Sequence, residues 1–212
     1  MKNKTLLVIG AIMLAMIGLV QPVFAKAESA NNPVALPTPT PAAGMARIVE
    51  TVEENDEVRE EYSDGSWSVQ YRGKSAEEVI KELGLEGQVT FIASYSKTDE
   101  PTMQLTRDSY ETRILDNTRV YYSNTGAVMA VLEEAYTVYY YTSNKVHLFT
   151  FSLDIHGASD YLNSRVVYGE IENTDGSLSY ISGTYAELIG NGTTERRPIN
   201  FIVTPTYHNF YE

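Results

Sequence analysis

The 212-residue chain contains no cysteine. Thiol catalysis, cysteine-ligated zinc, disulfide cross-links and lipid attachment through an N-terminal cysteine are therefore excluded. Small exported domains often need disulfides because their cores are small, but residues 45–212 are long enough to bury a sizeable core without them. We therefore expect a domain that is stabilised by packing alone.

Basic residues are scarce, with 16 Lys and Arg against 28 Asp and Glu and a formal net charge of −12. Lys2 and Lys4 are the only charged residues among the first 25, so the rest carries 14 basic and 28 acidic residues, a net charge of −14. Nucleic acids and anionic lipids attract cationic surfaces. The composition therefore predicts no nucleic-acid partner and no membrane contact by the mature domain, and its acidic surface is interpreted as a solvated one.

Long apolar runs are also rare, and the one present is residues 6–20. It follows Lys2 and Lys4 and precedes Val23-Phe24-Ala25, a pattern typical of a signal peptide and its cleavage site. The run is shorter than the ~20 residues of a spanning helix, and Pro22 breaks the helix just before the proposed cleavage site, which argues against an uncleaved membrane anchor. We expect residues 1–25 to be a cleaved signal peptide and the mature protein to be secreted or held at the cell surface.

Residues 26–44 contain Pro33, Pro37, Pro39 and Pro41 among small and polar residues. Such a segment favours extended polyproline conformations over helix or sheet. We interpret it as a disordered, proline-rich linker, and residues 45–212 as a single β-rich extracellular domain.

Turn signals separate a series of β-prone segments in this domain. The clearest signal is Ser63-Asp64-Gly65, which lies between residues 57–62 and 66–72 and predicts a hairpin. The acidic residues 50–61 are interpreted as a solvated edge or an initial segment of the domain. Further strands are predicted at residues 89–95, 112–122, 127–141, 147–155, 165–172, 178–189 and 199–204.

One helix is predicted between Ser75 and Gly84. Ser75 and Glu78 have the spacing of a capping box, and Gly84 ends the helix so that Leu85 can pack back on it. The apolar stripe expected to cover the sheet consists of Val79, Ile80 and Leu83. Together these patterns predict a mainly β fold, an antiparallel β-sandwich or barrel-like domain with one short helix, preceded by the signal peptide and linker.

The segment Tyr121-Tyr122-Ser123-Asn124-Thr125-Gly126 leads into a long strand that ends Tyr136-Thr137-Val138-Tyr139-Tyr140. This layout, and the meander after it, resembles a group of small exported β-domain proteins of Gram-positive bacteria that have no assigned activity. The resemblance rests on spacing and covers roughly the last hundred residues. It implies an exported β domain and supplies no catalytic residue; that group often carries a cysteine pair, which this chain lacks.

Catalytic and metal-binding patterns are sparse. With three histidines and no Gly-x-Ser-x-Gly motif, a Ser-His-Asp hydrolase is not expected, and no cofactor is predicted. Asp154 and His156 share one strand face and Asp160 follows in a loop, so these three are the candidate ligands for a divalent cation. The alternative is that they are ordinary strand-end and turn residues, since no recognised metal-ligand spacing supports the set.

Aromatic residues are more suggestive, because 16 tyrosines and one tryptophan lie mostly in predicted strands. Trp67, Tyr139, Tyr140 and Tyr141 are the candidate ligand-binding residues; alternation places Tyr139 and Tyr141 on one face and Tyr140 on the other. Tyrosines at half-buried strand positions are the structural alternative. The leading hypothesis is a secreted, non-catalytic binding or surface-interaction domain for an unknown glycan or protein. A carbohydrate-binding module that uses exposed aromatics, or a secreted hydrolase with unidentified catalytic acids, stays open.

Overall fold

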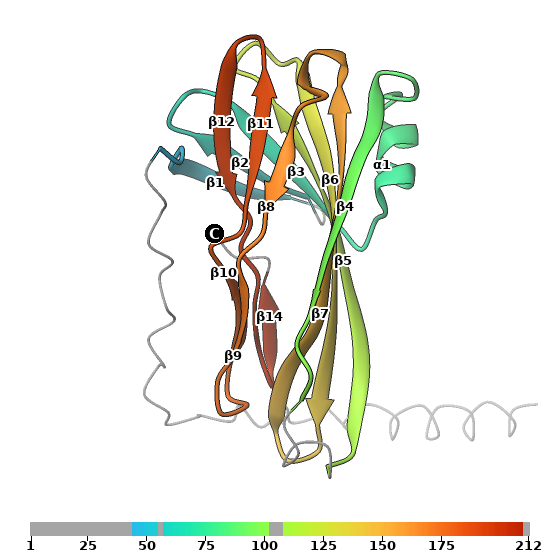
Figure 1. Cartoon of the computed structure of the whole chain (residues 1–212), viewed down its shortest axis with the longest axis vertical. Helices are drawn as coiled ribbons and strands as arrows, with labels where there is room; N and C mark the ends of the chain where they lie inside the picture. The colour runs from blue at the N-terminus through green and yellow to red at the C-terminus, as the bar shows by residue number, and fades with distance from the viewer. Residues whose placement is uncertain (1–43, 55–56, 102–107, 210–212) are drawn as a thin grey trace, which may run out of the picture. The chain divides into compact units, whose positions relative to one another are not determined.

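The computed structural model describes residues 44–54, 57–101 and 108–209 of the chain. The predicted signal peptide and all but the last residue of the predicted linker lie outside these ranges. The described part is mainly β, with antiparallel sheets packed in a sandwich-like arrangement and one short α-helix (Figure 1). The predicted fold class is confirmed; of its two alternatives, the described strands form open sheets and no closed barrel.

A seven-stranded antiparallel sheet forms the largest layer, in the order β1-β2-β3-β5-β6-β7-β4. Its three longest strands have 13 or 14 residues, so the sheet extends well beyond any single element packed on it. The strands are β1 (Ile48–Glu54), β2 (Glu57–Tyr62), β3 (Trp67–Arg72), β4 (Val89–Thr98), β5 (Tyr110–Tyr122), β6 (Val128–Tyr141) and β7 (Lys145–Ala158).

Two smaller sheets cover one face of the large sheet, β12-β11-β8 towards one end of the long strands and β14-β13-β10-β9 towards the other (Figure 1). The main core lies between these layers and includes Leu132, Phe151, Ile181, Leu188 and Phe201. The short strands are β8 (Arg165–Val167), β9 (Glu170–Asn173), β10 (Ser179–Ser182), β11 (Tyr185–Gly190), β12 (Thr193–Pro198), β13 (Ile202–Thr204) and β14 (Tyr207–Asn209), and a 3-10 turn, η2 (Ser159–Tyr161), follows β7.

Helix α1 (Ala76–Glu82) covers part of the opposite face of the large sheet. The predicted capping box is present, because Ser75 Oγ accepts a hydrogen bond from the Glu78 N–H and Glu78 Oε2 accepts one from the Ser75 N–H. The C-terminal closure is confirmed too: Gly84 has φ 65°, and the Leu85 N–H donates to the Ile80 carbonyl at 2.8 Å.

One residue of the predicted apolar stripe of α1 is not buried against the sheet. Val79 is fully buried and Ile80 packs beside it, but Leu83 is 36% exposed. The reason is the short length of the helix: Leu83 is already its C-cap, and Leu85 fills the buried place beyond the turn instead.

The core face of the large sheet is polar on the β2, β3 and β5 side. Strand β3 directs Ser68 and Gln70 to this face, where both are nearly inaccessible together with Glu60 of β2. The Glu60 carboxylate accepts hydrogen bonds from Gln70, from Ser68 at 3.3 Å and from the Tyr62 hydroxyl at 3.2 Å. Buried carboxylates require such partners because desolvation is costly.

Arg119 of β5 joins this cluster to β6. Its Nη1 atom lies 2.5 Å from Glu60 Oε2 and its Nε atom 3.4 Å from Glu134 Oε1, with all three side chains at most 1% exposed. Burial raises the pKa of Glu134, against the opposing effects of Arg119 and of the Tyr136 hydroxyl, which donates to Glu134 at 3.0 Å. We call Glu60, Arg119, Glu134 and the side chains that bind them the buried network.

The short strands differ from the sequence prediction. The segment predicted as one strand at 165–172 is split into β8 and β9, and the one at 178–189 into β10 and β11. The junction between β8 and β9 packs against the junction between β10 and β11. The Gly169 N–H donates a hydrogen bond to Thr184 Oγ1, and a Cβ on Gly169 would lie 1.6 Å from the Ser182 carbonyl oxygen. The chain changes sheet at this contact, which splits both segments. Strand β12 was not predicted, and the last predicted strand, 199–204, is reduced to β13.

Candidate functional site

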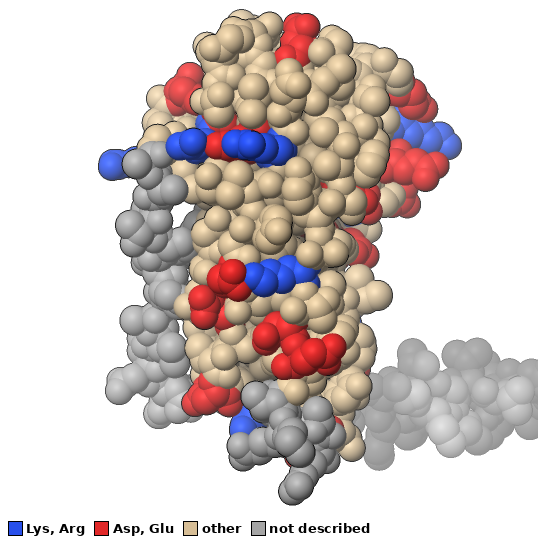
Figure 2. All heavy atoms as spheres, in the orientation of Figure 1, with Lys and Arg blue, Asp and Glu red and all other residues tan. Residues whose placement is uncertain are grey.

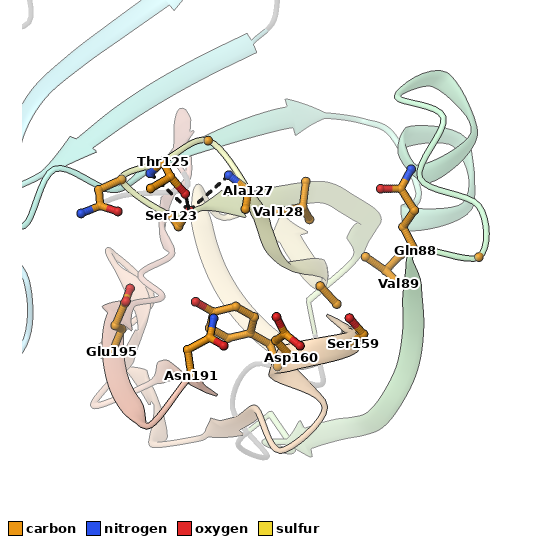
Figure 3. Close-up of a pocket in the computed structure, with 15 residues that line it drawn as sticks. Gln88, Val89, Ser123, Thr125, Ala127, Val128, Ser159, Asp160, Asn191 and Glu195 are labelled. Atoms are coloured by element: carbon orange, nitrogen blue, oxygen red, sulfur yellow. Dashed lines mark hydrogen bonds between the residues drawn. The ribbon is translucent and has the colours of Figure 1, made fainter.

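A depression of about 740 Å³ opens at the end of the large sheet that carries α1. Its volume is within the range of about 300–1,000 Å³ typical of small-molecule sites. Figure 3 shows four segments around it: the β5–β6 turn with Ser123 and Thr125, the start of β4 with Gln88, the β11–β12 hairpin with Asn191, and η2. We call this depression the end pocket.

The β5–β6 turn forms one wall. Ser123 Oγ accepts hydrogen bonds from the backbone N–H groups of Thr125 and Ala127, at 3.3 and 3.1 Å, and lies 2.9 Å from the Thr125 hydroxyl (Figure 3). Gly126 has φ 87°, a value that favours glycine, and a Cβ there would lie 3.4 Å from the Trp67 ring. The Ser-Asn-Thr-Gly sequence therefore fixes the turn and presents the Thr125 side chain at the pocket.

Two glycines allow η2 to pack closely at the base of the end pocket. A Cβ on Gly157 would lie 2.6 Å from the Tyr161 carbonyl oxygen, and a Cβ on Gly190 would lie 2.4 Å from the Asp160 carbonyl oxygen. Such contacts are too close for any larger residue without rearrangement. Because β7 and β11 both carry glycine at these points, η2 packs against both strands and Ser159 and Asp160 remain exposed at the pocket.

The β11–β12 hairpin forms the facing wall. Gly190 pairs with Thr193, so Asn191 and Gly192 are a two-residue loop, and both have positive φ values of 51° and 75°. These values are those of a type I′ turn, for which Asn-Gly is the preferred sequence. The turn holds the exposed Asn191 side chain beside the pocket (Figure 3).

Glu195 of β12 completes this wall and is anchored from behind by Arg197. The Arg197 Nη2 atom lies 2.6 Å from Glu195 Oε2 and 2.7 Å from Asp64 Oδ2, and the arginine side chain is 1% exposed. Burial raises the pKa of Glu195, an effect that Arg197 opposes and Asp64 reinforces. Since Arg197 also lies over the Tyr62 ring, it ties the wall of the pocket to the β2–β3 hairpin.

The lining of the end pocket is largely polar. Its fifteen lining residues supply hydroxyl, amide and carboxylate groups and include no Lys, Arg or His. Hydroxyls and amides both donate and accept hydrogen bonds, whereas carboxylates only accept. The side chains that can contact a ligand in this way are Gln88, Asn124, Thr125, Ser159, Asp160, Asn191 and Glu195, whereas the Ser123 hydroxyl is already bonded within its turn.

The four predicted aromatic ligand-binding residues do not form one surface. Trp67 pairs with Tyr122 at one end of β5, whereas Tyr141 pairs with Tyr110 at the other. With a rise of about 3.3 Å per residue, the two ends of β6 are about 40 Å apart. Trp67 stacks on Tyr122, at 5.4 Å between ring centroids, and Arg59 lies over its ring at 5.0 Å. Because β3 lies between β2 and β5, these neighbours cover the ring from both sides.

The alternation predicted for the three tyrosines of β6 is confirmed. Tyr139 and Tyr141 both contact Tyr110, while Tyr140 lies on the core side beneath the Arg113 guanidinium. Tyr139 stacks between Tyr110 and Phe149, with centroid distances of 4.5 and 4.9 Å. This ladder across three strands places an aromatic neighbour on either side of the Tyr139 ring.

The three predicted metal ligands are not brought together. Asp154 and His156 share the outer face of β7, where Ser94 donates a hydrogen bond to Asp154 and Phe91 packs edge-on against His156. Burial lowers the pKa of His156, with Glu133 and Asp154 acting in the opposite direction. Asp160 lines the end pocket instead. Among the described residues, no group of three or more His, Asp or Glu side chains has the geometry of a metal site.

Comparisons with protein-family models, with curated proteins and with solved structures each give no significant match. Within the described ranges, no helix is long and apolar enough to cross a membrane. The site residues that sequence reasoning missed, above all Asn191 and Glu195, lie on the unpredicted β11–β12 hairpin. The Asn191-Gly192 pair is a strong hairpin signal and would have located them. The fold and the end pocket therefore define a β domain with a polar pocket among its loops.

Proposed function

We propose that the chain is an exported, non-catalytic binding domain that holds a saccharide in the end pocket. The observation that supports this most is the pocket itself, which combines a ligand-sized volume with hydroxyl, amide and carboxylate groups from four separate segments. Saccharides present many hydroxyl groups, each of which donates and accepts hydrogen bonds. Such a lining is complementary to them without any charged cofactor.

The rigidity of the walls also supports binding. The β5–β6 turn is held by the hydrogen bonds of Ser123, and η2 is seated against Gly157 and Gly190. Loops on a rigid scaffold commonly carry ligand sites. A preformed site loses little entropy when it binds, which matters for a weakly bound polar ligand.

The test is a glycan array on the purified domain, with Asn191→Gly as the pocket variant. Glycine accepts the positive φ of residue 191, so this change removes the amide and keeps the turn. Asn144→Gly is the matched control, since Asn144 also has a positive φ, of 58°, in the β6–β7 turn away from the pocket. We expect neutral or amino glycans to bind, acidic glycans not to bind, and only Asn191→Gly to weaken the signal.

The array also tests binding by the aromatic residues. Tyr110 is 49% exposed and ends the aromatic ladder, so it offers the most accessible ring of that group. If Tyr110→Ala abolishes glycan binding and Asn191→Gly does not, the ligand lies on the sheet face and the end-pocket proposal is wrong.

A secreted hydrolase is the second candidate function, favoured by one observation. Asp160 and Glu195 line the same pocket, and burial raises the pKa of Glu195. Glycosidases use two carboxyl groups in different environments. The ion pair with Arg197 favours the ionised form of Glu195, which is why we place binding first. Release of reducing sugar from a bound glycan, abolished by Glu195→Gln, would instead establish hydrolysis.

Export after cleavage at Ala25 is part of the proposal. It is supported by the basic, apolar and Val-Phe-Ala zones of the first 25 residues and by the resemblance to exported β-domain proteins of Gram-positive bacteria. N-terminal sequencing of the protein from the medium or cell surface should find Lys26. An N-terminus at Met1 would contradict cleavage.

A further inference from the structure

The charge of the end pocket restricts its ligand further. Asp160 and Glu195 are its two ionisable acids, and none of its fifteen lining residues is a cation. Carboxylates repel uronic acids, sialic acids and phosphorylated sugars at close range. The overall charge acts in the same direction, because the whole chain has a formal net charge of −12 and acidic side chains predominate on the face shown in Figure 2.

The two carboxylates are not equivalent. Glu195 is paired with Arg197 at 2.6 Å, so part of its charge is already neutralised. Asp160 is exposed at the pocket and makes no side-chain hydrogen bond or ion pair with another described residue. Its two oxygens are therefore free to accept hydrogen bonds from a ligand, and a charged donor binds a carboxylate more strongly than a neutral hydroxyl does.

We infer that the end pocket selects a saccharide with an unsubstituted amino group, whose ammonium group binds Asp160. This inference rests on the proposed function, since it names the ligand class of the same pocket. The neighbouring groups suit the rest of such a sugar: the hydroxyls of Thr125 and Ser159 and the amide of Asn191 match its hydroxyl groups. An N-acetylated sugar has no positive charge and loses the ionic contact.

The expected preference is modest because Asp160 is exposed. An exposed ion pair with a charge-assisted hydrogen bond gives about a three- to tenfold gain in affinity. Screening weakens such a contact, so the preference should shrink as the salt concentration rises.

The experiment is a two-dimensional NMR titration of the isotopically labelled protein with D-glucosamine, N-acetyl-D-glucosamine and D-glucose at one pH and low salt. These probes share one ring and differ at carbon 2, which carries an ammonium, an acetamide or a hydroxyl group. We expect glucosamine to bind about three- to tenfold more tightly than the other two and to shift signals of residues 159–161 and 191. We expect 0.5 M NaCl to reduce this difference.

Asp160→Asn is the decisive variant, because it keeps the size of the side chain and removes its charge. It should equalise the three affinities, whereas the control Asp116→Asn, on an exposed residue of β5 outside the pocket, should leave the preference intact. Equal affinity of the unmodified protein for the three sugars would overturn the amine preference and leave saccharide binding standing. Failure of all three to shift any pocket signal at 50 mM would overturn both the inference and the proposed function.

Discussion

The buried network and the end pocket are both built from carboxylates, hydroxyls and amides, yet they differ in how far those groups are exposed to solvent. In the buried network Arg119 lies between Glu60 and Glu134, and Tyr62, Ser68, Gln70 and Tyr136 bind the same two carboxylates. In the end pocket Asp160 and Asn191 are exposed and have no side-chain partner among the described residues.

The polar groups of the buried network hold the fold together, whereas those of the end pocket are accessible to a ligand. A buried charge whose partner is removed is left desolvated, so the members of the network depend on one another. Exposed polar groups are solvated in the free protein and exchange water for ligand at little cost to folding. Substitutions should therefore affect stability in the network and binding in the pocket.

The largest expected effect is that of Arg119→Met. It leaves Glu60 and Glu134 without their cation at sites that are fully inaccessible, and we expect a loss of about 3–5 kcal/mol in the free energy of unfolding. Chemical denaturation measures it. The control is Arg113→Met, on an arginine with a 48% exposed side chain, for which we expect a loss below about 1 kcal/mol.

If the Arg119→Met protein does not fold, Arg119→Lys serves as the second variant. Lysine keeps the charge, but a single ammonium cannot reproduce the two separate contacts of the guanidinium, so an intermediate loss is expected. Equal stability of the Arg119 and Arg113 variants would show that the network is not a structural unit.

Gly190→Ala should have the next largest effect, and it connects the two kinds of region. The added Cβ would lie 2.4 Å from the Asp160 carbonyl oxygen and 2.6 Å from Tyr161 Cδ1, so η2 must move. We expect a loss of about 1–3 kcal/mol, measured by thermal or chemical unfolding, together with weaker saccharide binding. Ser159→Ala, in the same turn, is the control and should leave stability within about 0.5 kcal/mol.

Glu187 of β11 is an intermediate case, a buried carboxylate whose two partners are partly exposed. Arg165 and Arg196 donate to it at 2.6 and 2.9 Å, and although burial alone would raise the pKa of Glu187, these bonds lower it. A lowered pKa means that the carboxylate stabilises the fold above its unfolded pKa of about 4.3, and that this stabilisation is lost as the pH falls through the folded value.

Glu187→Gln should therefore lower the free energy of unfolding by about 1–2 kcal/mol at pH 7, a value reduced by the solvent exposure of the two arginines. The deficit should shrink below about pH 4, when the wild-type carboxyl also becomes protonated. Unfolding curves between pH 7 and pH 3 measure both effects, with the exposed Glu86→Gln as control. A deficit that stays constant across this range would contradict the assigned pKa direction.

Local signals predicted the elements that depend on neighbours in sequence. Ser63-Asp64-Gly65 gave the β2–β3 hairpin, and the spacing of Ser75 and Glu78 gave the start of α1. The breaks that separate β8 from β9 and β10 from β11 were not predictable in this way. They depend on the close approach of Gly169 to Ser182, two residues that only the packed sheets bring together.

One residue of the end pocket, Asp160, was selected from the sequence, but as a metal ligand. The structure groups it with Asn191 and Glu195, which follow more than 30 residues later, because β8 pairs with β11 and η2 packs against Gly190, and local patterns fix neither contact.

For the aromatic residues, the alternation of side chains along a strand correctly placed Tyr139 and Tyr140 on opposite faces of the sheet. It gave no information on how β6 is aligned with β5 and β7, and this alignment brings Tyr110 and Phe149 next to the Tyr139 ring.

The smallest expected change in stability is that of Asp160→Asn, and it is the sharpest test of the comparison. The Asp160 side chain is exposed and bonded to no described residue, and its amide analogue has nearly the same size, so the free energy of unfolding should change by less than about 0.5 kcal/mol. Glu134→Gln makes the same chemical change at the fully buried site, where the new amide cannot accept from Tyr136 and Arg119 as the carboxylate does, and a loss of about 1–3 kcal/mol is expected. Parallel denaturation curves of the two variants decide the matter. If Asp160→Asn destabilises the fold as much as Glu134→Gln, the end pocket is a structural element and its polar groups are not held free for a ligand.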